Sequence, residues 1–274
     1  MAHAKAVTTD AGQIPDDRRP RAGAAKPGAA PVYPVRMGQI SEQPVGEPVD
    51  FHGAATPQPV EHRGRYAVLR PLRPATDAVP LYEASHAPTG DPTIWTYLYT
   101  GPYPDLESFS AELEQQAASS DPLFFAITRP GDDTPLGVVS YMAIVPEHGS
   151  VELGHIWFSP ALQRTPAATE AIFLLIRHAF DELGYRRVEW KCNALNQPSR
   201  RAASRFGFEF EGVFRQHRVV KGRNRDTAWF AITDGRWPAI RTAFDQWLGP
   251  DNFDSGGNQR ESLSHLTASH QSGL

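Results

Sequence analysis

The chain has 274 residues, which is enough for one large domain or two small ones. Hydrophobic residues make up 40 % of it, an ordinary share for a globular protein, and the formal net charge of −4 argues against an extended surface for nucleic acid or anionic lipid. Cys192 is the only cysteine, so an intrachain disulfide and a cysteine-based metal cluster are both excluded.

Targeting signals are weak. No apolar run approaches the roughly 20 residues of a membrane-spanning helix, and the N-terminus lacks the apolar core of a secretory signal. Arg18, Arg19 and Arg21 would suit a transit peptide, but the aspartates nearby argue against one. We therefore expect a cytoplasmic protein, a monomer or homodimer, that binds neither membrane nor nucleic acid.

Both ends of the chain differ in composition from its middle. Residues 1–61 are rich in Ala, Pro and Gly and poor in aliphatic residues, which predicts a disordered tail, and Met37 offers an alternative translation start. Residues 251–274 are polar and contain Gly256-Gly257, which predicts a second disordered tail. One folded domain over residues 62–250 remains.

The first half of this domain begins with an alternating strand pattern over 66–72, followed by helical patterns over 75–86 and 105–118. Asp105 can cap the second of these helices. The expected strands that follow span 123–128, 137–145 and 151–158.

The clearest helix spans 166–183, because Pro166 suits the first helical position and apolar residues recur at helical spacing until Gly184. The pattern then predicts a strand over 187–192 and a short helix over 199–206. The remaining expected elements are a hairpin of strands over 208–220 and 227–232, joined by residues 221–224, and a helix over 237–248. This order of elements is typical of an α+β sheet domain.

Two polar turns follow neighbouring strands. Residues 163–169 open the long helix, where backbone N–H groups lack partners and the helix dipole is positive, and such a helix start attracts phosphate. Residues 193–199 follow the next strand. The pair of turns predicts one site for a long phosphorylated cofactor.

Three segments stand in a fixed order: Val151 to Trp157, then Asn196-Gln197-Pro198-Ser199 with Arg205 to Phe208 and Glu211-Gly212, then Gly222-Arg223 with Asp226 before Trp229-Phe230. They resemble the GNAT superfamily of N-acetyltransferases, the first segment its fourth strand and the last its closing hairpin, and the likeness covers about residues 64–247. It is closest to the branch that includes the ribosomal-protein N-terminal acetyltransferases. The resemblance implies the GNAT acyl-CoA N-acyltransferase fold, an α+β fold with a mixed, mostly antiparallel twisted sheet flanked by helices.

The same resemblance implies acetyl-CoA as co-substrate, with its pyrophosphate on the loop of residues 163–169 and its pantetheine arm along the fourth strand, whose amides polarise the carbonyl. Pro166 departs from the family pattern, because it replaces a glycine and removes one N–H donor. The alternative is that Pro166 merely starts a helix and nothing binds. The expected cofactor-binding residues are Ile156, Trp157, Phe158, Gln163, Arg164, Thr165, Ala167, Ala168, Thr169, Asn196 and Ser199.

Glu152 is the expected general base, and the alternative is a carboxylate paired with a neighbouring cation. Simple alternation puts His155 on the face of Leu153 and away from Glu152, which favours a hydrogen-bonded core histidine over a catalytic one. By resemblance, Ser199 donates to the leaving thiolate; alternatively it caps the short helix. For Asn196, a contact with the cofactor arm and a turn-forming role both stand.

The acceptor side is less defined. The aromatic run that contains Trp95, Tyr97 and Tyr99 borders the acceptor cleft by resemblance, and these rings either grip a substrate or cover the sheet. Arg218 belongs to a basic cluster that suits an acidic acceptor or the cofactor phosphates, or is simply solvated. Cys192 on its apolar strand is expected to be a buried, inert thiol. The ten histidines are scattered and form no metal motif, so no metal is expected.

The leading hypothesis is an acetyl-CoA-dependent N-acetyltransferase that acts by direct attack of a primary amine, on a protein N-terminus or a small molecule, in a ternary complex. One alternative is a sensor or scaffold domain of the same fold that binds acyl-CoA without turnover. Another is a protein-interaction domain without cofactor. Fold-level likeness does not supply the acceptor.

Overall fold

The structure is a computed structural model that describes residues 44–86, 88 and 90–269. The chain divides into two units, residues 1–49 and 50–274. The described part of the first unit, residues 44–49, is extended and exposed. The helices in the described ranges are all too short or too polar to cross a membrane.

An eight-stranded sheet with the order β1-β2-β3-β4-β5-β6-β8-β7 forms the centre of the second unit. Strands β5 and β6 run parallel, and the other neighbouring pairs of these eight strands are antiparallel. The strands are β1 (His62–Arg63), β2 (Val68–Pro71), β3 (Leu123–Arg129), β4 (Asp132–Val145), β5 (Ser150–Phe158), β6 (Arg187–Asn193), β7 (Glu209–Val220) and β8 (Arg223–Thr233).

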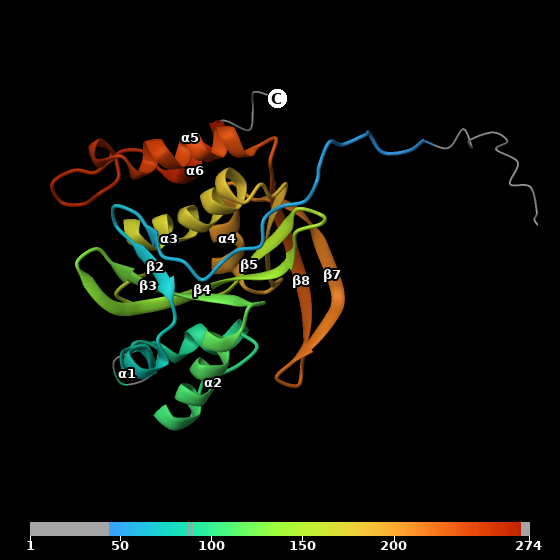
Figure 1. Ribbon diagram of the computed structural model, residues 1–274. Helices are drawn as coiled ribbons and strands as arrows, with labels where there is room; N and C mark the ends of the chain where they lie inside the picture. The colour runs from blue at the N-terminus through green and yellow to red at the C-terminus, as the bar shows by residue number, and fades with distance from the viewer. Residues whose placement is uncertain (1–43, 87, 89, 270–274) are drawn as a thin grey trace, which may run out of the picture. The chain divides into compact units, whose positions relative to one another are not determined.

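Helices cover both faces of the sheet: α3, α5 and α6 lie on one face, and α1 and α2 lie on the other (Figure 1). This arrangement confirms the expected α+β fold with a mixed, mostly antiparallel sheet flanked by helices. The helices are α1 (Pro74–Ser85), η1 (Pro92–Tyr97), α2 (Leu106–Ala118), α3 (Pro166–Arg177), η2 (His178–Glu182), α4 (Gln197–Arg205), α5 (Trp237–Leu248), η3 (Pro250–Asn252) and α6 (Leu263–Ser269).

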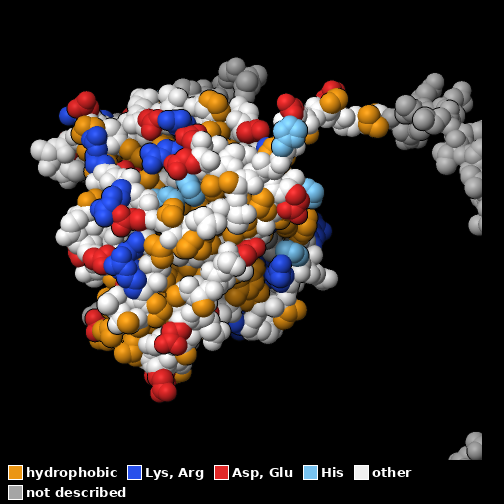
Figure 2. Space-filling view, viewed as in Figure 1, with side chains coloured by type: hydrophobic (Ala, Val, Ile, Leu, Met, Phe, Trp, Pro, Cys, Tyr) orange, Lys and Arg blue, Asp and Glu red, His pale blue; other side chains and the backbone are white. Residues whose placement is uncertain are grey.

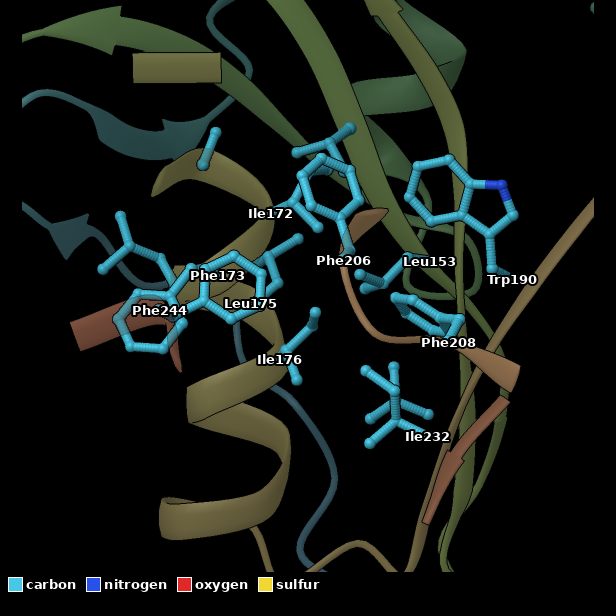
Figure 3. Packing of buried hydrophobic residues seen from close by; sticks show 14 of the residues in the cluster. Leu153, Ile172, Phe173, Leu175, Ile176, Trp190, Phe206, Phe208, Ile232 and Phe244 are labelled. Carbon is cyan, nitrogen blue, oxygen red and sulfur yellow. The ribbon is translucent and has the colours of Figure 1, made fainter. Parts of the chain in front are cut away.

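The larger hydrophobic core lies between the sheet and α3, as Figure 3 shows. Phe173 of α3 stacks on Phe244 of α5 with ring centroids 4.9 Å apart. A second core, which contains Trp95 and Phe109, lies under α1 and α2 on the opposite face. Because each fully buried side chain of this size stabilises the fold by about 1.5–3 kcal/mol, these two cores hold the sheet between its helices.

Glu170 ties α3 to the edge of the sheet. Its buried carboxylate accepts the backbone N–H groups of Arg65 at 2.9 Å, Tyr66 at 2.5 Å and Ala67 at 2.8 Å. Gly64 permits this close approach, because a Cβ at that position would collide with the carboxylate. The start of α3 is therefore fixed relative to β2 by three charge-assisted hydrogen bonds.

The long helix predicted over 166–183 has the expected extent, but its last turn is a π-helix, η2. The Tyr141 hydroxyl donates to the Leu175 carbonyl at 2.6 Å, and the Leu183 amide reaches back five residues to the His178 carbonyl. A side chain that inserts into the helical ladder in this way widens the turn.

The expected disordered tails need correction where the structure describes them. The amides of Ala54 and Ala55 bond the carbonyls of Pro146 and Leu183, so the folded unit begins before residue 62. Residues 1–43 lie outside the described chain.

At the other end, the expected disordered tail over 251–274 is wrong for residues 251–269. Leu263 and Leu266 are buried against the main core, and the Trp247 indole N–H donates to Gln259 Oε1 at 2.8 Å. The polar composition of this segment gave no sign of a packed helix, because a helix as short as α6 docks on the core through only two apolar side chains.

Two buried histidines meet beneath β1. The rings of His62 and His178 lie 4.4 Å apart, and the Nε2 atom of His62 is buried without a hydrogen-bond partner in the described chain. Burial, with His178 and Arg177 nearby, lowers the pKa of His62 from its ordinary 6.5 to about 4. Burial also lowers the pKa of His178.

This pair predicts acid sensitivity. Below pH 6.5 the unfolded chain binds more protons than the folded one, so stability falls as the pH drops from 6.5 towards 4. We expect His62→Phe to lose several degrees less in Tm than the wild type between pH 7 and pH 4.5. Calorimetry at both pH values tests this, and equal losses in the two proteins would rule out His62 as a source of the sensitivity.

Candidate functional site

The site is organised by the divergence of two parallel strands. Strands β5 and β6 pair only from Ser150↔Arg187 to Leu153↔Trp190. Beyond that point β5 carries a bulge, with His155 at a φ of +50° and a register shift against β4. Because β6 does not follow β5 past the bulge, the backbone edge of β5 is open to pairing with an extended ligand.

The bulge also corrects the predicted faces of β5. Simple alternation grouped His155 and Trp157 with Leu153, but the two rings lie on the other face, against Phe124 and Trp95 respectively. His155 is therefore on the same face as Glu152. Its Nδ1 lies 3.1 Å from Ser140 Oγ, and burial lowers its pKa, which keeps it neutral at pH 7.

Glu152 ends a row of alternating charges that crosses the sheet. Arg187 bonds Glu211 in a bidentate pair at 2.5 and 2.7 Å and Glu189 at 2.7 Å. Lys191 then bonds Glu189 at 2.6 Å and Glu152 at 2.8 Å. Because Glu152 and Glu189 are cross-strand neighbours in β5 and β6, the ammonium between them offsets their repulsion.

The pKa of Glu152 is raised, because burial outweighs the attraction of Lys191. Lys191 contacts Oε2 of Glu152, so the second oxygen of that carboxylate can still accept a proton. Both sequence readings of Glu152, ion-paired carboxylate and group able to act as a base, are thus compatible with one geometry.

Two cavities meet where the strands diverge. The short cavity, about 100 Å³, is lined by Glu152, His155, Lys191 and Cys192, among others. The long cavity, about 1080 Å³, extends over the start of α3. The residues that line both are Ile94, Tyr97, Ile156, Trp190, Asn196 and Ser199.

Figure 2 shows one face of the molecule, on which acidic and basic side chains are interspersed and hydrophobic ones gather near the middle. This face carries no patch of a single charge sign.

The start of α3 forms one end of the long cavity. Thr165 is the N-cap: its Oγ1 accepts the Ala168 amide at 3.3 Å and donates to the Leu162 carbonyl at 2.7 Å. Counting from this cap, the Ala167 amide is one that the helix itself cannot satisfy, whereas Thr169 lies beyond the first four N–H groups. Of the amides of Ala167, Ala168 and Thr169, that of Ala167 is therefore the one left unpaired, although Ala167 itself is not among the residues that line the long cavity.

The other loop side chains divide into two groups. Arg164 is exposed at a φ of +60° and lines the long cavity, whereas the Gln163 side chain donates to the Phe158 carbonyl at 2.9 Å and so braces the loop against β5. Ile156, Trp157 and Phe158 also line this cavity, as expected, although the Trp157 ring is buried in the second core.

Arg205 is a site residue that sequence reasoning missed. Its Nη1 donates to Thr169 Oγ1 at 3.0 Å, and its guanidinium lies 4.9 Å from the Trp247 ring centroid. Like Arg164, it lines the long cavity, which therefore has two cations on its lining. The same lining includes Phe253 and residues 257–259 of the C-terminal segment.

The second polar turn brings Asn196 and Ser199 to the junction of the cavities. Asn196 is the N-cap of α4, because its Oδ1 accepts the Ser199 amide at 3.1 Å. The alternative that Ser199 caps this helix is therefore wrong. The Ser199 hydroxyl accepts the Trp190 indole N–H at 3.0 Å and hydrogen-bonds the Cys192 thiol.

The expected acceptor residues separate. Trp95 is a core residue, 4 % exposed, and its indole N–H donates to the Ser85 carbonyl, so an exposed substrate-gripping role is wrong for it. Tyr97 and Tyr99 line the short cavity. Arg218 is exposed and lines neither cavity, whereas Arg225, its cross-strand neighbour, lines the short cavity together with Lys191.

A family model described as an acetyltransferase (GNAT) domain matches residues 67–209. The chain belongs to the GNAT acetyltransferase family. The expected family and fold are confirmed, and relatives named as N-acetyltransferases identify the chain as an N-acetyltransferase. One of these is an uncharacterised N-acetyltransferase of Bacillus subtilis, 26 % identical over 157 residues, which are 57 % of this chain and 89 % of the relative.

Solved GNAT structures agree. A GCN5-related N-acetyltransferase from Brucella melitensis is 43 % identical, with a TM-score of 0.77 over 80 % of this chain and 99 % of that chain. A GNAT-family chain from Chromobacterium violaceum is 40 % identical, with a TM-score of 0.67 over 73 % and 100 %. An acetyltransferase from Salmonella typhimurium that modifies the N-terminal serine of ribosomal protein L7/L12 shares the fold, at 20 % identity and a TM-score of 0.54 over 62 % of this chain and 96 % of that chain.

The geometry of the α3 cap predicts the effect of a charge change. Thr165→Glu puts a carboxylate beside the Ala167 amide and Arg164, so we expect it to weaken coenzyme A binding at least tenfold. Thr165→Ser keeps the capping hydroxyl and should bind within a few-fold of the wild type. Titration calorimetry measures both affinities, and a Thr165→Glu protein that binds coenzyme A normally would place the phosphates elsewhere.

Proposed function

We propose that this GNAT protein is an acetyl-CoA-dependent N-acetyltransferase that transfers acetyl to a primary amine by direct attack in a ternary complex. One observation carries the proposal: a long cavity that ends on a cationic helix start meets a short polar cavity that contains a buried carboxylate. A thioester with a long phosphorylated arm suits the first cavity, and an amine suits the second.

The residues present fit acetyl-CoA. The unpaired Ala167 amide at the start of α3 would supply a hydrogen-bond donor for a diphosphate. Arg164 and Arg205, both on the lining of the long cavity, would supply two cations. The open edge of β5 suits an extended arm with amide groups. When bound, acetyl-CoA would supply the activated acetyl carbon, and the residues around it would provide orientation.

Pro166 does not remove this fit. As the first helical residue it gives up an N–H that would be unpaired by the helix in any case. Arg164 and Arg205 supply positive charge for the phosphates, which compensates for the N–H donor that Pro166 lacks. This supports phosphate binding despite the departure from the family pattern.

Glu152 is the proposed general base. The acceptor reaches the active site as an ammonium and must lose a proton before its nitrogen can form a bond to the acetyl carbon as the carbon–sulfur bond breaks. The raised pKa of the buried Glu152 carboxylate brings its basicity closer to that needed at neutral pH. Lys191, held by Glu189 as well, fixes the carboxylate in place.

Ser199 is the proposed donor to the departing thiolate. Its oxygen accepts the Trp190 N–H, its proton bonds the Cys192 sulfur, and it lies on the lining shared by the cavities. A thiolate is a stronger acceptor than a thiol and would compete for that proton. Cys192 is less suited to an acyl-cysteine route, because burial raises its pKa and keeps it a thiol, although a hydrogen bond from Ser199 opposes this in part.

The alternative of an acyl-CoA sensor without turnover shares the long cavity but gives no role to a buried carboxylate with a raised pKa in the short one. Consumption of acetyl-CoA with an amine panel, followed by thiol release, separates the two. Binding of coenzyme A with no thiol release for any amine would favour the sensor.

Glu152→Gln tests the base. We expect kcat to fall by about 10²–10³-fold while the Kd for coenzyme A changes less than threefold, because the residue lies in the short cavity. In the wild type kcat/KM should rise with pH through an inflection above 4.5, as Glu152 loses its proton, and the variant should lack that inflection.

The matched control is Glu211→Gln, which removes a carboxylate at the far end of the same ion-pair row that contacts neither Lys191 nor the short cavity. It should retain most of the wild-type kcat. Comparable losses in the two variants would reduce Glu152 to a structural role in the ion-pair row.

A further inference from the structure

Arg225 is a buried cation in the short cavity that has no anionic partner. Its side chain is 6 % exposed and lines this cavity. Its Nε donates to Thr227 Oγ1 at 3.3 Å, and its guanidinium lies 4.6 Å from the Tyr99 ring centroid. Neither partner is charged, and no Asp or Glu in the described ranges forms an ion pair with it.

The neighbouring charges differ from Arg225 in this respect. Lys191 forms ion pairs with both Glu152 and Glu189. Arg187 forms ion pairs with both Glu189 and Glu211. A buried charge without a partner is costly, so proteins seldom retain one that has no ligand to meet. The guanidinium presents planar donors that match a carboxylate in bidentate fashion.

Arg225 and Glu152 face the same small space. Both line the short cavity, and the positive charge of Arg225 is among the influences that act on the Glu152 carboxylate. One cavity of about 100 Å³ therefore offers a carboxylate for an ammonium group and an unpaired guanidinium for an anion. A molecule that carries both charges a few bonds apart matches this pattern.

We propose that Arg225 binds a carboxylate of the acceptor and that the acceptor is a small zwitterionic amine, a free amino acid. The inference rests on the proposed acetyl transfer and adds the substrate class. A protein N-terminus lacks the carboxylate next to its amine, because that group is tied up in the first peptide bond. In the amino acid, the ammonium gives one proton to Glu152, and the freed nitrogen bonds the acetyl carbon as the carbon–sulfur bond breaks. The thiolate leaves with a proton from Ser199, and the second proton lost by the nitrogen restores the Ser199 hydroxyl.

The first experiment uses the wild-type protein with acetyl-CoA and matched acceptors. Free amino acids, their α-amides and short peptides that begin with the same residues are compared by initial rates of thiol release. We expect at least one amino acid to exceed its own amide and peptide at least tenfold in kcat/KM. Equal or faster acetylation of amides or peptides would overturn the proposal and leave acetyl transfer intact.

Failure of the proposed function has a different signature. If no acceptor releases thiol, or if coenzyme A does not bind in calorimetry, the acetyl-transfer hypothesis fails first. Because the comparison of an amino acid with its amide needs only the wild type, it decides the acceptor class even where a variant does not fold.

The second experiment uses Arg225→Gln, Arg225→Lys and the control Arg223→Gln, which removes an exposed cation two residues away on the same strand. Arg225→Gln should lower the amino-acid to amide ratio of kcat/KM by about 10–100-fold, through KM more than kcat, and Arg225→Lys should restore part of it. Arg223→Gln should keep the wild-type ratio.

A binding measurement completes the test without turnover. With coenzyme A present, the preferred amino acid should raise the Tm of the wild type and of Arg223→Gln but not that of Arg225→Gln. A shift retained in a folded Arg225→Gln protein, or an unchanged selectivity ratio, would show that Arg225 does not bind the acceptor carboxylate.

Discussion

The site depends on two parallel strands that pair for four residues and then diverge. A sheet tolerates this only if each strand has another neighbour, and β4 and β8 supply those neighbours on either side. The bulge at His155 turns β5 away and sends its side chains to new faces. One local backbone irregularity thus opens both cavities and decides which side chains line them.

Electrostatics follows from the same arrangement. Residues 187, 189 and 191 project from one face of β6. Their ion pairs form a continuous row from Glu211 on β7 to Glu152, which lines the short cavity. Each member compensates its neighbours, so the row is buried at modest cost. Arg225 stands outside this compensation. The paired charges of the row therefore hold the structure together, whereas the unpaired Arg225 leaves the short cavity able to bind an anion.

Sequence reasoning recovered the longer helices and strands, the fold class and the family, because periodicity, caps and turns are local properties, but it missed β1, η1, η3 and α6. It also singled out Glu152, which lines the short cavity, and Asn196 and Ser199, which line both cavities. It could not foresee the bulge, since nothing in alternation signals an extra residue, and so it put His155 on the wrong face.

Long-range packing explains the remaining misses. Arg218 and Arg225 look alike in a basic hairpin, and only the position of Tyr99 and the cavity distinguishes them. The sequence around Trp95 suggested an exposed loop aromatic, but in the fold its indole N–H donates to the Ser85 carbonyl and its ring is buried. Arg205 belongs to a short helix with few apolar residues, and its role follows from where Thr169 and Trp247 lie.

The docked C-terminal segment has a practical consequence for handling the protein. A recombinant version trimmed at residue 250, where the composition changes, would lose the Gln259 acceptor of the Trp247 indole and the two leucines of α6. It would also lose one wall of the long cavity. Negative ligand screens on such a trimmed version would describe a damaged cleft rather than the natural one.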